Sequence, residues 1–281
     1  MRLLSGQRVA NKILKQVKDD VLKYCQNDIQ PTLAVVMATN DPQAERYVRS
    51  LMRSARACSI KVDLDRLDAG SSTKTIAKTL QSYAQNSSIH GLILQTPLPK
   101  RVDVDSLYNF IPYQKDIDGA TVMSAGQLAF GLPTFVPATA QAVIALFEHY
   151  KINVEGKHVV IVGRSRIVGK PLAQLLLQKN ATVTVCHSKT KKLSRITRNA
   201  DILAVAVGKA GLITPKYVHR NQVIIDIGTN VNKLNKLEGD VAANVVDKVR
   251  AITPVPGGIG PITTALILQH VVTAVGAQIL S

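Results

Sequence analysis

The chain has 281 residues, of which 46% are hydrophobic, so it can bury a full core and is not disordered by composition. The 35 basic residues outnumber the 19 acidic ones, giving a net charge of +16, but aromatic residues make up only 4% and no nucleic-acid motif is visible. We therefore interpret the charge as a solvated surface that also attracts small anions, and we expect no nucleic-acid partner.

Cysteine and histidine usage excludes other classes of site. The three cysteines are far apart and the six histidines are scattered, so we expect neither a disulfide framework nor a metal site. No apolar run reaches the ~18 residues of a membrane span, and the first residues turn polar too soon for a signal peptide. We expect a cytoplasmic protein that does not bind membranes.

The first half of the chain alternates helices with short strands. Apolar spacing predicts helices over 6–27, 43–58 and 71–86, and strands over 32–38, 60–67 and 91–94. Asn40-Asp41-Pro42 and Ser71-Ser72-Thr73 are typical of residues that cap the start of a helix.

Gln95 follows the strand at 91–94 and begins a candidate pocket wall. Pro97 and Pro99 end sheet pairing and stiffen this loop. Ligands of open α/β sheets bind beyond the carboxyl ends of strands, where Gln95 is expected. Further along, Asp118 precedes Gly119, a pair that is equally typical of a plain turn.

Residues 158–171, HVVIVGRSRIVGKP, have the pattern of a phosphate-binding crossover. A β-branched strand at 159–162 runs into Gly163, and Pro171 opens a helix over 172–179. The start of such a helix offers free N–H groups and a positive dipole end to an anion. Ser165 stands where the dinucleotide fingerprint has its middle glycine, so a βα unit without a ligand stays open as an alternative.

The following strand, 182–186, indicates which dinucleotide is bound. NAD sites usually carry an acidic residue near the end of this strand, but here His187, Ser188 and Lys189 follow. Hydroxyl and cationic groups accept a 2′-phosphate that a carboxylate repels, and Arg164 is placed to close on the same phosphate. We therefore predict NADP, with a plain solvated loop as the alternative.

The rest of the chain completes two α/β domains. We predict a helix over 139–150, strands over 200–207 and 223–227, and a final helix over 263–280, while the Gly- and Pro-rich residues 253–261 are expected to be irregular. The fold class is α/β, and the second domain is Rossmann-like. The first domain is predicted to cover 1–138, completed by a C-terminal helix at 262–281, and the dinucleotide domain 139–261.

Several separate stretches together resemble the methylenetetrahydrofolate dehydrogenase/methenyltetrahydrofolate cyclohydrolase family. They are Asp41-Pro42, Tyr47-Val48, GLILQTPLP from Gly91, KDIDG from Lys115, GRSRIVGKP from Gly163, ATVTVCHSKT from Ala181 and TPVPGGIGPIT from Thr253. The resemblance implies NADP-dependent oxidation of 5,10-methylenetetrahydrofolate, in bifunctional members followed by hydrolysis to 10-formyltetrahydrofolate. It also implies a homodimer with folate in the cleft between the two domains.

The resemblance also implies roles for individual residues. Tyr47 would contact the folate rings, Gln95 would lie by the reacting carbon, and Asp118 would bind the pterin. The implied cofactor residues are Gly163, Arg164, Ser165, Ile167, His187, Ser188, Gly228, Thr229 and Ile259. Further substrate contacts would come from Gly258, Gly260, Pro261 and Thr263.

One departure from the family pattern bears on the chemistry. Family members usually carry a lysine four residues after the tyrosine, and here that position is Leu51. Leucine neither donates a proton nor activates water, and Arg49 and Arg53 point away from it on a helix. Other drifted positions are Ser124 for asparagine, Ala138 and Ala140 in the P-C-T-P segment, and Thr229 for isoleucine.

We therefore hypothesise an NADP-dependent dehydrogenase with weak or absent cyclohydrolase activity. Hydride transfer chiefly requires positioning, whereas hydrolysis requires a group that activates water. Two alternatives stay open at this point: a non-catalytic folate- or nucleotide-binding relative that acts as a sensor or partner subunit, and a dehydrogenase for another substrate.

Overall fold

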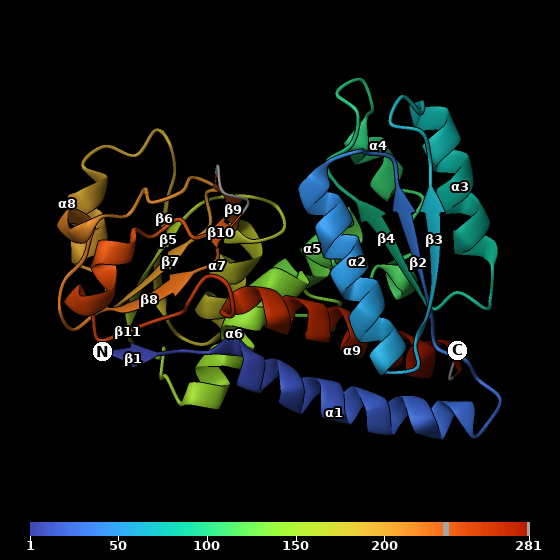
Figure 1. Cartoon of the computed structure of the whole chain (residues 1–281), viewed down its shortest axis with the longest axis horizontal. Coiled ribbons are helices and arrows are strands. Elements are labelled where there is room, and N and C mark those ends of the chain that lie inside the picture. Colours follow the sequence, from blue (N-terminus) through green and yellow to red (C-terminus); the bar gives the residue numbers. More distant parts are fainter. Residues whose placement is uncertain (233–235, 280–281) are drawn as a thin grey trace. The chain divides into compact units, whose positions relative to one another are not determined.

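The structure is a computed structural model that describes residues 1–232 and 236–279, and it divides into two compact units. Unit 1 comprises Met1–Ala10 and Pro137–Thr263, and unit 2 comprises Asn11–Val136 and the chain from Thr264 onward. Residues 1–10 differ from the predicted division, because strand β1 (Arg2–Leu3) pairs in parallel with β11 (Ala251–Ile252) in the sheet of unit 1 (Figure 1).

Unit 1 is built on a parallel sheet with the strand order β1-β11-β8-β7-β5-β6. Its central strands are apolar and buried on both faces, as parallel strands covered by helices must be. They are β5 (His158–Val162), β7 (Ile202–Val205) and β8 (Val223–Asp226), whereas β6 (Thr182–Cys186) forms one edge of the sheet and is partly exposed. The strand predicted over 200–207 is therefore shorter than expected.

The remaining elements of unit 1 connect and cover these strands. The helices are α6 (Ala138–Tyr150), α7 (Gly169–Gln178) and α8 (Leu193–Arg198), with short 3-10 turns at Pro215–Tyr217 and Ala243–Lys248. A small antiparallel pair, β9 (Asn230–Val231) and β10 (Leu237–Glu238), stands apart from the main sheet.

The strand order of unit 1 reverses beside β5, and the glycine turn lies at this point. β5 pairs with β6 on one side and with β7 on the other. Gly163 ends β5 with φ +131°, and a Cβ atom there would lie 2.2 Å from the Ala206 carbonyl oxygen. A Cβ on Gly169 would lie 2.2 Å from the Gly163 carbonyl oxygen. Both glycines are therefore required by close backbone approach.

Unit 2 has a smaller parallel sheet with the order β3-β2-β4, formed by β2 (Thr32–Met37), β3 (Lys61–Arg66) and β4 (Gly91–Gln95) (Figure 1). Its strand order also reverses beside its first strand, β2. The edge strand β3 is partly exposed, as its alternating pattern predicts, whereas β2 is fully buried. The helices and turns of this unit are α2 (Pro42–Ala57), α3 (Thr73–Gln85), α4 (Val104–Tyr108), a 3-10 turn at Tyr113–Lys115, and α5 (Val122–Ala129).

The predicted caps begin α2 and α3. The Asp41 carboxylate accepts hydrogen bonds from the backbone N–H groups of Gln43 (2.9 Å) and Ala44 (2.8 Å). The Ser72 hydroxyl accepts one from Thr75 N–H at 3.1 Å. Each side chain satisfies donors that have no partner within the helix, so both predicted helix starts are confirmed.

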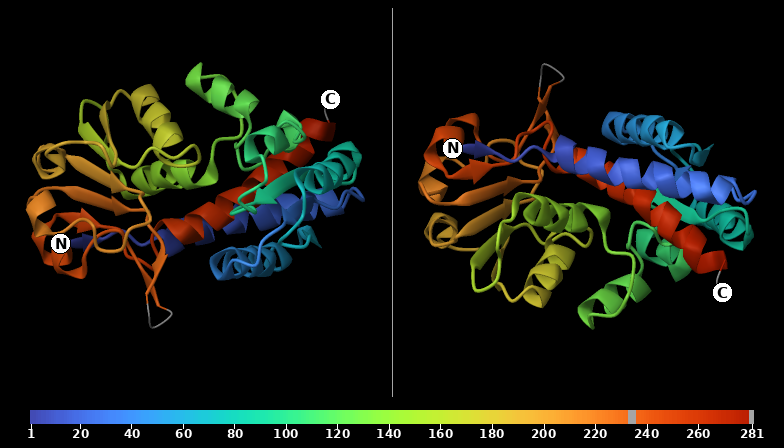
Figure 2. Two further views of the ribbon diagram at one scale, coloured as in Figure 1. Left: turned by 90° about the horizontal axis from the view of Figure 1, so that it is seen from above. Right: turned by 90° about the horizontal axis from the view of Figure 1, so that it is seen from below.

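Two long helices, α1 (Gly6–Cys25) and α9 (Ile259–Ile279), have their larger parts in unit 2, where they lie side by side (Figure 2). α9 begins at Ile259, so the expectation that 253–261 is irregular is wrong for its last three residues; Pro261 falls in the first turn, where proline is tolerated.

By length and composition α9 is long and apolar enough to cross a membrane, which differs from the expectation from the sequence. However, 56% of its most apolar window is buried in the protein, and His270 on this helix hydrogen-bonds to the Ile117 carbonyl oxygen of unit 2. Within the described structure α9 therefore packs as a core helix.

Two glycine substitutions are expected to change stability in opposite directions. Gly163→Ala forces a Cβ against a backbone carbonyl at positive φ and should cost about 2–4 kcal/mol of unfolding free energy. Gly126→Ala is the matched control: Gly126 lies inside α5 with open space around its Cβ position, so alanine should stabilise by about 0.5–1 kcal/mol. Urea unfolding of both variants measures this, and equal midpoints would contradict the close approach at Gly163.

Candidate active site

The sequence-predicted substrate residues Tyr47, Gln95 and Asp118 lie in unit 2, on three different segments. Tyr47 lies in the second turn of α2, Gln95 is the last residue of β4, and Asp118 follows the 3-10 turn at Tyr113–Lys115. Because β4 is parallel to β2 and pairs Gln95 with Met37, Gln95 stands at the carboxyl edge beside the reversal of strand order.

Tyr47 and Asp118 lie close enough to affect each other electrostatically. Burial, followed by the charge of Asp116, raises the pKa of Asp118 from 3.8 to about 7. Burial, followed by the charge of Asp118, raises the pKa of the Tyr47 phenol well above its ordinary value. The phenol is therefore a hydrogen-bond donor at neutral pH, next to a carboxyl group that exchanges its proton in the same range.

A buried hydrogen-bond network fixes the segment that carries Asp118. The Asp116 carboxylate accepts hydrogen bonds from Ala120 N–H (2.9 Å), Thr121 N–H (2.9 Å) and the Ser124 hydroxyl (2.6 Å). Burial raises the pKa of Asp116, and these hydrogen bonds oppose the rise. Ser124, noted above only as a departure from asparagine, thus has a defined role in this segment.

Lys115 and His270 anchor the same segment to other elements of the unit. The Lys115 ammonium donates to the carbonyl oxygens of Ala84 (2.8 Å) and Asn86 (2.7 Å) at the end of α3, and burial lowers its pKa. His270 Nδ1 lies 2.7 Å from the Ile117 carbonyl oxygen, which only accepts, so the ring proton is on Nδ1. Burial lowers the pKa of His270 to about 4, and this ring is neutral at pH 7.

Sequence reasoning missed these supporting residues. Lys115 and Asp116 belong to the K-D-I-D-G motif. A lysine and an aspartate beside a glycine turn could have indicated a loop that is fixed by hydrogen bonds. His270 gave no local signal, because it lies far along the chain in an apolar helix.

Leu51 has no exposed surface and belongs to the buried side of α2 with Ala44, Val48 and Ala55. It follows Tyr47 by one helical turn, the spacing that places two side chains on the same side of a helix. Arg49 and Arg53 are exposed, as expected from their direction on the helix. No cationic side chain of α2 therefore replaces the usual lysine on this buried side.

Gln95 is half-buried, and its side-chain N–H donates to the Thr96 carbonyl oxygen at 2.6 Å. The amide is thereby directed at the backbone of its own loop. The structure thus brings Tyr47 and Asp118 together. Gln95 lies apart from this pair, at the carboxyl edge of the sheet of unit 2.

The predicted cofactor residues all lie in unit 1. Arg164, Ser165 and Ile167 are exposed in the turn between β5 and α7, above the buried backbone of Gly163 and Gly169. The closely packed glycines leave this turn without Cβ atoms at its base and lead directly into α7. This arrangement suits a pyrophosphate group held at a helix start.

The end of β6 presents hydroxyl and cationic groups. His187 Nδ1 accepts a hydrogen bond from Lys189 N–H (3.1 Å), and the Thr190 hydroxyl accepts one from His187 N–H (2.9 Å). This tight turn leaves Ser188 and Lys189 exposed, with Lys191 and Lys192 beyond them. The residues present therefore fit a dinucleotide that carries a 2′-phosphate.

The remaining predicted residues lie after β8, directly before α9 or in the first turns of α9. Gly228 is buried, and a Cβ there would lie 2.1 Å from the Asp240 carboxyl carbon, whereas Thr229 is exposed. Gly258 lies under Gly6, whose Cβ would meet the Gly258 carbonyl oxygen at 1.7 Å. Ile259, Gly260, Pro261 and Thr263 form the first turns of α9.

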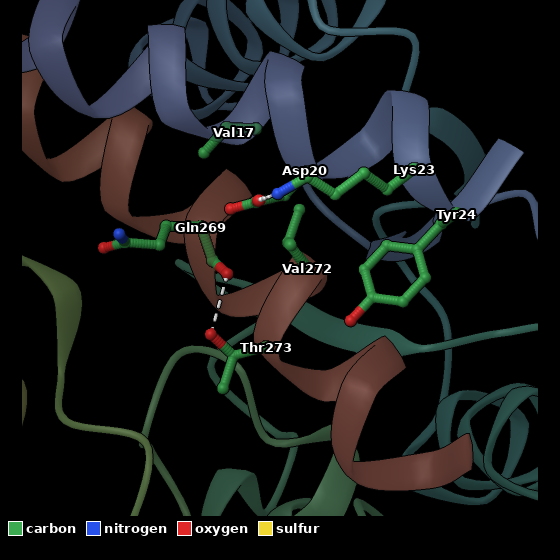
Figure 3. A pocket seen from close by; sticks show the side chains of 7 residues that line it. All are labelled: Val17, Asp20, Lys23, Tyr24, Gln269, Val272 and Thr273. Atoms are coloured by element: carbon green, nitrogen blue, oxygen red, sulfur yellow. Dashed lines mark hydrogen bonds and ion pairs between the residues drawn. The ribbon is translucent and has the colours of Figure 1, made fainter. Parts of the chain in front are cut away.

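Two surface hollows lie away from these residues. One, of about 480 Å³, lies between α1 and α9 and is lined by Val17, Asp20, Lys23, Tyr24, Gln269, Val272 and Thr273 (Figure 3). The other, of about 430 Å³, lies in unit 1 around Phe147 and Lys179. None of the predicted site residues lines either hollow. Among the described residues, no group of three or more His, Cys, Asp or Glu is placed to hold a metal.

Two family models match the chain. The catalytic domain of tetrahydrofolate dehydrogenase/cyclohydrolase matches residues 4–118, and the NAD(P)-binding domain of the same family matches residues 137–279. The matched ranges contain the two groups of residues described above, with Tyr47, Gln95 and Asp118 in the first and the glycine turn in the second.

Individual relatives agree with the family models. The bifunctional protein FolD 1 of Rhodococcus jostii (strain RHA1) is 48% identical over 280 residues, covering 99% of this chain and 94% of its own. The crystal structure of the bifunctional methylenetetrahydrofolate dehydrogenase/cyclohydrolase FolD from Campylobacter jejuni has a TM-score of 0.95 at 35% identity, with 99% of each chain covered.

A third relative was solved with a ligand. The Trypanosoma brucei dehydrogenase-cyclohydrolase, complexed with NADP and an inhibitor, has a TM-score of 0.94 at 29% identity, covering 99% of this chain and 98% of its own. The predicted two-domain α/β fold and the predicted resemblance are confirmed. The chain belongs to the tetrahydrofolate dehydrogenase/cyclohydrolase family and carries both its catalytic and its NAD(P)-binding domain.

Proposed function

We propose that this protein oxidises 5,10-methylenetetrahydrofolate to the 5,10-methenyl form with NADP, and that its cyclohydrolase step is weak or absent. The observation that carries the second part is Leu51, fully buried where the family usually has a lysine. The named functions of the relatives support the first part, together with the glycine turn and the uncharged or basic end of β6.

The oxidation moves a hydride from the methylene carbon of the folate and leaves a methenyl cation. NADP, when bound, supplies the hydride acceptor. The protein has only to hold the two reactants in line, which is a positioning task. We assign Asp118 to hydrogen-bond the pterin, Tyr47 to contact its ring system, and Gln95 to lie beside the reacting carbon. Gly163, Arg164, Ser165, Ile167, His187, Ser188, Gly228, Thr229 and Ile259 are proposed to hold the cofactor, and Gly258, Gly260, Pro261 and Thr263 to complete the substrate contacts.

Hydrolysis of the methenyl cation makes a different demand. Water must add to the cation and lose a proton, and a group that activates it contributes ~10²–10⁴ in rate. The isobutyl side chain of Leu51 offers neither a proton acceptor nor a donor. Of the nearby ionisable groups, the Tyr47 phenol is held protonated, and the Asp118 carboxyl is assigned to the pterin.

Two further proposals accompany the reaction. We propose a homodimer, supported by an exposed apolar surface on and after α5 where Val122 is 80% and Phe130 84% exposed; such side chains suit contact with another protein. We also propose a cytoplasmic location, supported by the burial of α9.

Restoring the lysine tests the assignment of Leu51. Leu51→Lys should raise formation of 10-formyltetrahydrofolate at least ~10-fold relative to the dehydrogenase rate, because one water-activating group is regained. Leu51→Met is the matched control of similar volume and should give no gain. Product analysis of both variants, after circular dichroism confirms folding, decides the point. A folded Leu51→Lys variant that forms no more 10-formyltetrahydrofolate than the unaltered protein would contradict the proposal that Leu51 weakens the cyclohydrolase step.

Cofactor choice is tested at the end of β6. Lys189→Glu places a carboxylate where we propose the 2′-phosphate and should raise the KM for NADP by about 10-fold or more, with less effect on NAD. Lys216→Glu makes the same charge change on the exposed 3-10 turn that precedes β8, and the ratio of NADP to NAD turnover should stay unchanged. Equal turnover of the unaltered protein with NAD and NADP would refute the 2′-phosphate assignment.

The raised pKa of Asp118 predicts a pH effect on stability in the absence of ligand. The carboxyl holds its proton up to about pH 7 in the folded chain but only to about 3.8 when unfolded. The contribution of the Asp118 carboxyl group to the free energy of unfolding is therefore fully present below pH 3.8 and is lost as the pH rises to 7. Relative to the unaltered protein, Asp118→Asn should become more stable between pH 4 and 7, by up to about 4 kcal/mol. Urea unfolding at several pH values measures the difference, and a constant difference would contradict it.

A further inference from the structure

Asp240 is a fully buried aspartate just after β10, and its carboxylate is saturated with hydrogen bonds from unit 1. One oxygen accepts from Val207 N–H (2.7 Å) and Gly208 N–H (3.1 Å). The other accepts from Lys209 N–H (2.7 Å) and from the Asn230 side-chain amide (2.9 Å). Four donors on one carboxylate hold the buried charge in place.

These donors come from two segments at the carboxyl edge of the sheet. Val207–Lys209 follow β7, and Asn230 begins β9 directly after Gly228 and Thr229, the loop that follows β8. The first loop also abuts the glycine turn, because the Ala206 carbonyl oxygen lies 2.2 Å from where a Gly163 Cβ would stand. Asp240 thus ties together the loops that surround the proposed dinucleotide.

A second buried carboxylate holds Asp240 itself. Asp226, at the end of β8, accepts from the N–H groups of Asp240 (3.0 Å), Val241 (3.0 Å) and Gly228 (3.1 Å). Two glycines make this arrangement possible: a Cβ on Gly239 would lie 1.8 Å from the Asp226 carboxylate, and one on Gly228 would lie 2.1 Å from the Asp240 carboxyl carbon. The arrangement therefore has little freedom to shift.

We propose that Asp240 is a positioning residue for the dinucleotide, which fixes the loops after β7 and β8 so that their outer surface is preformed for the cofactor. This rests on the proposed function, in that NADP is taken to bind at this edge. The three N–H groups of 207–209 all point inward to Asp240, so they are not donors to a cofactor phosphate. That task falls to the glycine turn and the start of α7.

Asp240→Asn tests the proposal with an isosteric change. In this variant an amide nitrogen replaces one carboxylate oxygen, and this nitrogen cannot accept a hydrogen bond. The donors on that side of residue 240 are therefore left without an acceptor. In cofactor-free protein, hydrogen exchange at Val207–Lys209 should accelerate at least ~10-fold. The Kd for NADP by isothermal titration should rise about 10-fold, while the KM for the folate at saturating NADP changes less than 2-fold. Asp247→Asn, an exposed aspartate in the following 3-10 turn, removes the same charge and should change none of these.

Asn230→Ala is the second variant and decides the matter if Asp240→Asn does not fold. It removes one hydrogen bond to Asp240 and a longer one to the Glu238 carbonyl oxygen (3.4 Å), and it should raise the Kd for NADP about 3-fold. An unchanged Kd in a folded variant with accelerated exchange would overturn the proposal, as would equal losses of folate and NADP affinity. Failure of the unaltered protein to bind NADP would instead refute the proposed function.

Discussion

Both units are parallel sheets, and the place where the strand order reverses governs where polar chemistry can lie. At β5 in unit 1 and β2 in unit 2, the chain crosses over first to one side and then to the other. The loops that follow neighbouring strands therefore diverge at the carboxyl edge of the sheet. The backbones there approach so closely that Gly163 and Gly169 admit no side chain. Most of the predicted cofactor residues follow strands at these edges, and Gln95 is the last residue of such a strand. Tyr47 and Asp118 come from the flanking helix α2 and a turn.

Burial then divides the site residues into groups with different capabilities. Asp118 keeps an exchangeable proton near neutral pH, Tyr47 is held as a donor, and Leu51 contributes only apolar surface. In the function that we propose, such a set orients a pterin, which serves hydride transfer. It lacks the group that would guide water to a methenyl cation. In the function that we propose, the absence of one ammonium group separates two consecutive reactions, because only the hydrolysis of the methenyl product requires proton transfer.

Much of the fold could be predicted because it rests on local signals: the caps Asp41 and Ser72, the apolar strands, and the glycine turn. The pairing of β1 with β11 could not, because two-residue strands carry no periodicity and the partner lies about 250 residues away. The start of α9 was misplaced because glycine and proline are also tolerated in a first turn. The small helices α4, α5 and α8 were missed for lack of an apolar period long enough to recognise.

Site residues divide in the same way. Motifs indicated Tyr47, Gln95, Asp118 and the glycine turn, since each stands in a short, recognisable stretch. The supporting groups gave no signal in the sequence: His270 acts through an atom 153 residues away, and Asp240 acts chiefly through backbone N–H groups of one loop, the first of them 33 residues away. Their partners are carbonyls and amides, which every residue has, so no spacing in the sequence reveals them.

The most direct measurement follows methenyltetrahydrofolate after purified protein is mixed with methylenetetrahydrofolate and NADP. The account predicts that methenyl absorbance rises and then decays no faster than in a protein-free control, with NADPH formed in equal amount. Rapid decay of the methenyl form with matching production of 10-formyltetrahydrofolate by the unaltered protein would contradict it.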